Sequence, residues 1–136
     1  MKLSAGSEYG LKALADLAIN LKDKPVSVAS IAERQNIPLK YLELVFSSLR
    51  RAGLVRSLQG TGGGYMLARP AAEIRLSEIL KVLEGDLSIV EEEAAENTES
   101  LCRCIKENLW DVVSGRIYDV LDSISLQDLI DNKCEA

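Results

Sequence analysis

The stretch from Pro38 to Tyr65 limits what this chain can fold into more than any other part of the sequence. Its first half predicts an amphipathic helix that Pro38 opens, because the missing N–H of proline is no loss at the first helical position. Gly53 then suits the left-handed residue just past a helix end. Apolar residues recur at steps of three and four along this segment, at Leu39, Leu42, Val45, Phe46 and Leu49.

The second half of the stretch predicts a two-stranded hairpin, with strands at about Leu54–Leu58 and Tyr65–Ala68. The connection, residues 59–64, holds four glycines and is too rich in them to pack against anything. A helix followed at once by a hairpin with a bare tip is the geometry of a winged helix-turn-helix. In that module the helix enters the major groove of DNA and the wing reaches the neighbouring groove or the backbone.

Helical patterns on either side of this stretch complete the module. Glu8–Leu21 predicts a first helix with Ser7 as its cap, and Val28–Gln35 predicts a short second helix. Another short helix, from Leu76 to about Gly85, follows the hairpin. We therefore expect a mainly α fold with a small β-hairpin wing, in which residues 1–85 form the DNA-binding domain.

The rest of the chain predicts an acidic linker over residues 86–97 and a dimerisation unit over residues 98–136, which ends in a short helix. A long helix from about Thr98 to Ile124 carries an apolar stripe over about six turns. The stripe must be buried against the first domain or a second subunit. We expect a homodimer, because helix-turn-helix proteins read two half-sites with two-fold symmetry. The expected interface residues are Leu101, Ile105, Leu109, Trp110, Val113, Ile117, Val120 and Leu121.

Charge changes sign along the chain, whose net charge is −5. Residues 1–70 hold ten Lys/Arg against five Asp/Glu, a net +5, whereas residues 71–136 hold six against sixteen, a net −10. A basic front half suits contact with DNA. No apolar run approaches the roughly 20 residues that span a bilayer, and the start lacks an apolar signal region, so we expect a cytoplasmic protein. The chain has no histidine and no catalytic constellation, so we do not expect an enzyme.

Polar side chains of the predicted recognition helix supply the candidate contacts to DNA. Lys40 can reach a phosphate or a guanine, Tyr41 can donate to a phosphate, and Glu43 can accept from the cytosine amino group. The glycine turn lets backbone amides approach a phosphate, and Gln59 could hydrogen-bond in the minor groove. An isolated helix of this kind would merely be solvated, but the following wing favours DNA binding. The expected DNA-binding residues are Lys2, Pro38, Lys40, Tyr41, Glu43, Leu44, Ser47, Arg50, Arg51, Gln59, Gly60, Thr61 and Gly62.

Motifs in this region resemble the Rrf-two family of bacterial winged-helix regulators. They are Tyr41-Leu42-Glu43, Leu49-Arg50-Arg51-Ala52-Gly53-Leu54-Val55 and Gly60-Thr61-Gly62-Gly63-Gly64-Tyr65. The likeness extends over nearly the whole chain. It implies a homodimer joined through the long helix that represses or activates at palindromic promoters, and we expect a repressor. It also implies that Glu43 contributes to the choice of DNA site. Some members of the family place an arginine at the wing tip where this chain has Gln59, so we expect a weaker preference for A-tracts.

The cysteines depart from the family's pattern. Some members hold an iron–sulfur cluster with three cysteines about five or six residues apart. Cys104 resembles the last of these, but the counterparts of the first two fall near Glu92 and Thr98, and the other cysteines are Cys102 and Cys134. An iron–sulfur cluster, a thiol redox switch and a purely structural role stay open alternatives. Other members lack a cluster and respond through a partner enzyme of cysteine metabolism, and that alternative is open as well.

A second class of function also stays open. A winged-helix protein-interaction adaptor that has lost specific DNA binding would fit Glu8, where relatives often carry a basic residue, and Gln59 at the wing tip. Gel shifts at low and high salt separate the two functions, because a DNA binder loses affinity steeply as salt rises.

Overall fold

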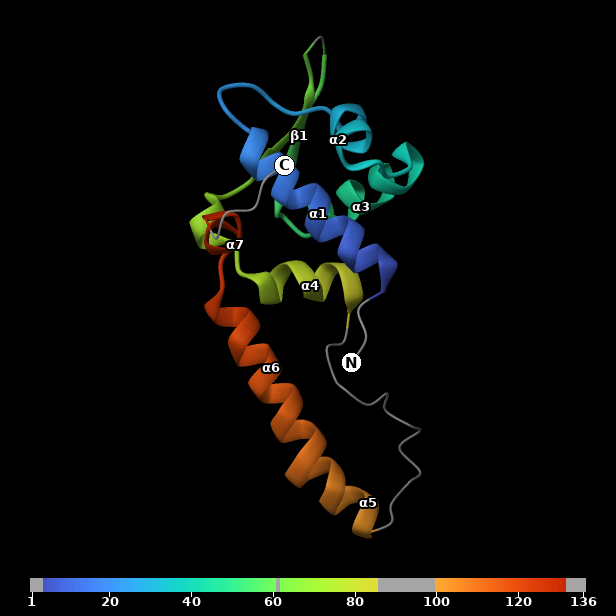
Figure 1. The fold of residues 1–136 in the computed structure, drawn as a ribbon, viewed down its shortest axis with the longest axis vertical. Helices are drawn as coiled ribbons and strands as arrows, with labels where there is room; N and C mark the ends of the chain where they lie inside the picture. Colours follow the sequence, from blue (N-terminus) through green and yellow to red (C-terminus); the bar gives the residue numbers. More distant parts are fainter. Residues whose placement is uncertain (1–3, 61, 86–99, 132–136) are drawn as a thin grey trace.

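The computed structural model describes residues 4–60, 62–85 and 100–131, which form helices and one two-stranded hairpin. The long helix extends away from the body that contains the other helices and the hairpin (Figure 1). The elements are α1 (Ala5–Asn20), α2 (Val28–Gln35), α3 (Leu39–Arg51), β1 (Val55–Leu58), β2 (Gly64–Leu67), the 3-10 turn η1 (Ala71–Glu73), α4 (Leu76–Glu84), α5 (Ser100–Ile105), the π-helical turn η2 (Lys106–Trp110), α6 (Asp111–Ser123) and α7 (Leu126–Asp131). None of the helices described is long and apolar enough to cross a membrane.

Serines cap the first two helices. The Ser4 hydroxyl accepts a hydrogen bond from the Ser7 N–H at 3.2 Å, and the Ser27 hydroxyl accepts one from the Ser30 N–H at 3.1 Å. The prediction that Ser7 caps the first helix was wrong, because the helix begins at Ala5 and Ser7 is fully buried within it.

The second helix of the helix-turn-helix, α3, follows α2 after a three-residue connection, residues 36–38. The turn begins at Asn36, which has a left-handed φ of 54°. Pro38 stands just before α3 as its N-cap and not as its first residue, with an extended ψ of 130°. Gly53 follows the end of the helix with a φ of 80°, so the predicted left-handed position is confirmed.

The hairpin is antiparallel, and the chain before α2 extends it. Val55 pairs with Leu67 and Leu58 with Gly64 across the two strands. Val26 bonds Tyr65 of β2 from its other side, with N···O distances of 2.9 and 2.8 Å. A side chain at Gly64 would collide with the carbonyl of Val26, so the close approach of the two backbones requires glycine there. The base of the wing is therefore fixed to the helix-turn-helix.

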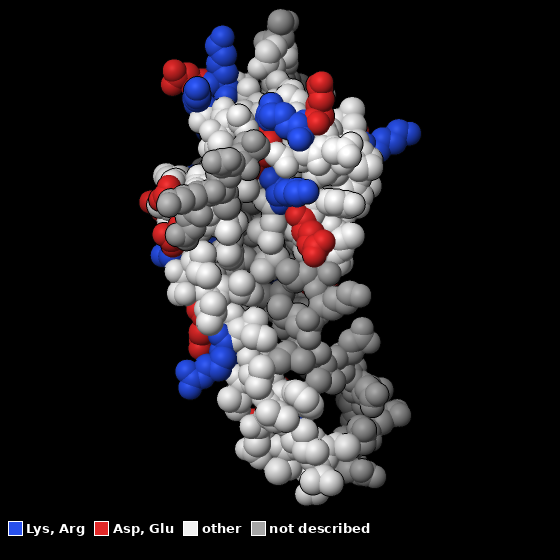
Figure 2. Space-filling model, viewed as in Figure 1, with Lys and Arg blue, Asp and Glu red and all other residues white. Residues whose placement is uncertain are grey.

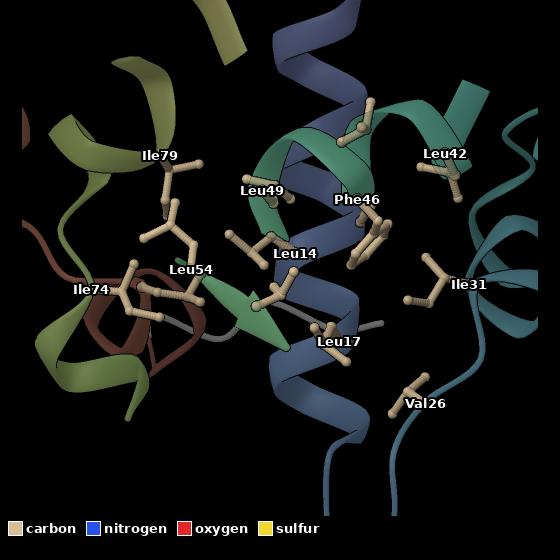
Figure 3. Close-up of a cluster of buried hydrophobic side chains, with 14 of the residues drawn as sticks. Leu14, Leu17, Val26, Ile31, Leu42, Phe46, Leu49, Leu54, Ile74 and Ile79 are labelled. Carbon is tan, nitrogen blue, oxygen red and sulfur yellow. The ribbon is translucent and has the colours of Figure 1, made fainter. Parts of the chain in front are cut away.

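One apolar core joins these elements. Phe46 of α3 lies among leucines and isoleucines from the helices and from the residue just before β1 (Figure 3). The largest fully buried apolar side chains are Phe46, Leu14, Leu17, Ile31, Leu42, Leu49, Ile74, Ile79, Leu126 and Val55. Because α3 supplies three of them, its orientation is set by the core and its opposite face is left free.

The final helix returns to this core. Ser125 and Asp128 form a capping box, in which each side chain accepts the other residue's N–H at 3.0 Å. Leu126 is fully buried, and its N–H donates to the carbonyl of Ile74 at 2.8 Å. The division of the chain into domains stays a prediction, but α7, which the sequence grouped with the long helix, packs on the winged body.

Candidate nucleic-acid interface

The exposed face of α3 lies opposite its buried stripe. Steps of four, three and four residues place Lys40, Leu44, Ser47 and Arg51 on one line along the helix. Of these, only Ser47 is half-buried, and the others are exposed. Glu43 and Arg50 are exposed beside this line. Leu39 departs from the prediction that it faces inward, because at the first residue of the helix it is 41% exposed.

Tyr41 does not project freely from α3 as the sequence predicted. Its ring meets the ring of Tyr9 edge-on, with centroids 5.6 Å apart and an angle of 80° between the planes. A side chain at Gly6 would collide with the Tyr41 hydroxyl oxygen. The start of α3 is thus packed against the start of α1, and Tyr41 positions the recognition helix whether or not it also reaches a phosphate.

The wing projects beyond the helices (Figure 1). Its turn needs glycine, because Gly60 and Gly62 have φ values of 99° and 80°. The N–H of Gly63 donates to the carbonyl of Gly60 at 2.9 Å and closes the turn. Gln59 is exposed beside it. Two of the predicted contacts, Lys2 and Thr61, lie outside the described residues.

The basic side chains of this region stay available to a polyanion. None of the ion pairs among the described residues involves Lys40, Arg50, Arg51 or Arg56. Arg51 makes one long hydrogen bond, from its Nη2 to the Ser48 hydroxyl at 3.4 Å. Lys and Arg side chains are interleaved with Asp and Glu over the winged body, whereas the lower end of the long helix is mostly uncharged in the same view (Figure 2).

Most of the large apolar side chains on the long helix are exposed. Residues 100–123 form one helical segment, because Ile105 and Asp111 at the borders of η2 both have helical dihedral angles. No residue of α5, η2 or α6 is buried. Of the predicted interface residues, Leu101, Ile105, Leu109, Trp110 and Val120 are exposed, and Val113, Ile117 and Leu121 are half-buried.

The π-helical turn η2 keeps the apolar stripe on one face. Residues four apart drift by about 40° per step on a helix of 3.6 residues per turn. Over the four steps from Leu101 to Ile117 the drift would reach about 160°, nearly to the opposite side. The extra residue that a π turn accommodates turns the helix back by about 100°, which leaves these residues within about 60° of one another.

Together, a helix with a free polar and cationic face and a glycine-tipped hairpin braced on the same core define a winged helix-turn-helix, a class of DNA-binding protein. The model of the Rrf2 (Rrf-two) family, described as an iron-dependent transcriptional regulator, matches residues 3–132. The chain belongs to the Rrf2 family of transcriptional regulators. It is a DNA-binding transcriptional regulator and not an enzyme.

Relatives and solved structures agree with this assignment. The chain is 38% identical over 133 residues to the HTH-type transcriptional regulator IscR of Pectobacterium carotovorum, covering 98% of this chain and 81% of the relative. CymR, the global cysteine regulator of B. subtilis, superposes with a TM-score of 0.82 at 36% identity, covering 98% of this chain and 99% of that one. The IscR of T. potens superposes with a TM-score of 0.77 at 36% identity, covering 100% and 93%.

The described residues do not fit the iron–sulfur cluster that some family members hold. Cys102 and Cys104 are two positions apart on α5, so their side chains leave the helix about 200° apart and cannot bind one ion together or form a disulfide within the helix. The Cys104 sulfur accepts a hydrogen bond from the Asn108 amide at 3.1 Å. Within the described part of the chain no three Cys, Asp or Glu side chains are placed to hold a metal. Cys134 lies outside that part.

Proposed function

We propose that this regulator is a homodimeric repressor that reads a palindromic operator. One observation supports the proposal most strongly: the long helix presents an apolar stripe that η2 aligns on one face and that is exposed over most of its length. Single exposed apolar residues are ordinary, but a contiguous exposed stripe marks an interface. A second copy is the occupant that also gives the two-fold symmetry which helix-turn-helix proteins use at paired half-sites.

In the proposed complex each α3 enters the major groove of one half-site. Lys40 and Arg51, at the two ends of the exposed line, contact phosphates, and Glu43 contacts a base edge. The amides of Gly60 and Gly62 approach the neighbouring backbone closely. These roles rest on the exposure of the side chains and on the geometry of the module.

The dimer is tested with two variants of α6 that are matched in exposure. Val120 is 57% exposed and lies on the stripe, whereas Val112 is 51% exposed and lies about 80° away from Val120 around the helix. We expect Val120→Glu to shift the protein to monomers in sedimentation velocity at low concentration, because it places an unpaired charge in the seam. Val112→Glu should sediment like the wild type. Equal behaviour of the two variants would contradict the proposed interface.

DNA binding is tested in the same preparations. We expect the wild type to select a palindromic site from random duplexes, with affinity that falls steeply as salt rises. A protein that stays dimeric but selects no site would favour the protein-interaction adaptor instead. A thiol switch and a response through a partner enzyme of cysteine metabolism stay open alternatives; the similar protein CymR is named the global cysteine regulator of its own organism.

A further inference from the structure

Leu44 is an apolar side chain where the recognition helix should present polar ones. It is 70% exposed, more than any other large apolar residue described in the winged body, where Tyr9, Leu39 and Leu58 reach 38%, 41% and 46%. Nothing in the described fold covers it, and it adds nothing to the core. We therefore expect Leu44 to contact another molecule.

Its place on α3 indicates which contact that is. Leu44 lies about 200° around the helix from the buried Leu42, at 100° per residue. It stands on the outward line between Lys40, one turn before it, and Ser47, one turn after it. Arg51 follows another turn later. When the two cations contact phosphates, the side chain between them faces the floor of the groove, where the base edges lie.

A leucine in that position cannot read hydrogen-bond donors or acceptors. The major groove presents one apolar group, the C5-methyl of thymine, and the minor groove presents none. We propose that Leu44 is a specificity-determining residue that recognises thymine in each half-site through this methyl group. The inference rests on the proposed function, since it requires α3 to lie in the major groove.

The test removes the methyl group from the DNA without changing the bases or their pairing. The full-length protein first selects an operator from random duplexes. Each thymine of that operator is then replaced in turn by deoxyuracil, and affinity is measured by fluorescence anisotropy at one salt concentration. We expect one symmetry-related thymine per half-site whose methyl contributes about fourfold to affinity, the usual effect of burying one such carbon.

The same scan with Leu44→Ala forms a chemical double-mutant cycle. The fourfold penalty at that thymine should disappear in the variant, while the effects at other thymines persist. Leu44→Met keeps an apolar contact and should retain most of the penalty. Leu58→Ala is the control, because this exposed leucine belongs to the wing and its loss should leave the whole uracil profile unchanged. Since Leu44 is exposed, all these variants should melt like the wild type.

Three outcomes are distinguishable. A uracil penalty that Leu44→Ala removes at one thymine per half-site supports the inference. A wild-type protein that binds the operator but shows no such penalty, or shows the same penalty in Leu44→Ala, overturns it and leaves the proposed function intact. A wild-type protein that selects no operator contradicts the proposed function itself.

Discussion

Arg34 of α2 and Asp16 of α1 form an ion pair, with 2.6 Å between Nη2 of the arginine and Oδ1 of the fully buried aspartate. The Arg34 Nε and the Gln35 amide both donate to the other oxygen, at 3.0 and 2.7 Å. The hydrogen bond to Asp16 also raises the pKa of Arg34. This contact holds the first helix of the helix-turn-helix on α1, and the recognition helix depends on both.

Removing Arg34 and removing Asp16 should lower the free energy of unfolding by different amounts. The Arg34 side chain is 37% exposed and regains water when its partner is lost, whereas the Asp16 carboxylate cannot. We expect Arg34→Met to lower the free energy of unfolding by about 3 kcal/mol and Asp16→Asn, which keeps the shape of the side chain, by about 1–2 kcal/mol. Urea denaturation at neutral pH measures both, and the reverse order would show that burial of the carboxylate is not the dominant cost.

Glu84, the last residue of α4, bonds the start of α1. Its Oε2 accepts hydrogen bonds from the Ser4 N–H at 3.1 Å, from the Ser4 hydroxyl at 2.9 Å and from the buried Ser7 hydroxyl. These bonds, chiefly the one from Ser7, lower the pKa of Glu84. A carboxyl group whose pKa is lowered by folding stabilises the fold above its ordinary pKa of about 4.3, and the stabilisation is lost as pH falls through the folded-state pKa.

We therefore expect Glu84→Gln to lower the melting temperature at pH 7. As the pH falls below about 4, the melting temperature of the variant should approach that of the wild type. Ser7→Ala removes the main hydrogen-bond donor to Glu84 and should also reduce the pH dependence of the melting temperature. Differential scanning fluorimetry across this pH range checks the prediction. A gap in melting temperature that does not change with pH would mean that the charge of Glu84 makes no contribution.

Leu126 tests whether α7 belongs to the cooperative core of the winged body. Its side chain is fully buried, so Leu126→Ala should lower the free energy of unfolding by about 2–5 kcal/mol. Gln127→Ala, on the next residue of the same helix, should change it by about 0.5 kcal/mol or less. Urea denaturation followed by circular dichroism separates them. Equal, small effects would make α7 an appendage of the long helix.

The winged module could be predicted from the sequence because its signals are local. Gly53 ends α3 and Gly60 and Gly62 close the wing because each has a positive φ that other residues adopt at a cost. The start of α1 was misplaced for a different reason. Ser4 and Ser7 are equally good caps on their own, and the hydroxyl of Ser7 bonds Glu84, which is distant in sequence.

The features that could not be predicted from the sequence depend on contacts between distant residues or on the register of a helix. Nothing near Val26 indicates that it pairs with Tyr65 across the wing. The apolar residues of the long helix could be predicted from the sequence, but a regular helix would have spread them around the surface. The sequence gives no signal for η2, which brings the stripe together. Leu44 was expected among the DNA-binding residues, yet its degree of exposure depends on how the core fixes α3.

The π turn gives a prediction that separates register from composition. Deleting Asn108 should convert η2 into regular α-helix and leave Val113 and Ile117 in register with Leu101, because it removes the one extra residue that the π turn accommodates. We expect this deletion variant to dimerise like the wild type in sedimentation equilibrium. Inserting one alanine after Asn108 should instead rotate Val113 and Ile117 by about 100° relative to Leu101, split the stripe and weaken the dimer by at least tenfold. Unchanged association of the insertion variant would mean that the two ends of the stripe bind independently.

Glu43 should influence which operators are chosen more than how tightly DNA is held. It is exposed on α3 beside the line of Lys40 and Leu44, and a carboxylate gains nothing from phosphates. It can accept a hydrogen bond from the cytosine amino group, and it penalises bases that present only acceptors, at roughly 1–3 kcal/mol per base pair. We expect Glu43→Ala to relax the consensus at one position per half-site in a random-site selection.

Arg51→Ala is the matched control. It should weaken binding to all sequences about equally, because it loses a phosphate contact, and it should reduce the slope of log affinity against log salt by about one. If parent and Glu43→Ala select identical consensus sequences, Glu43 has no part in base recognition.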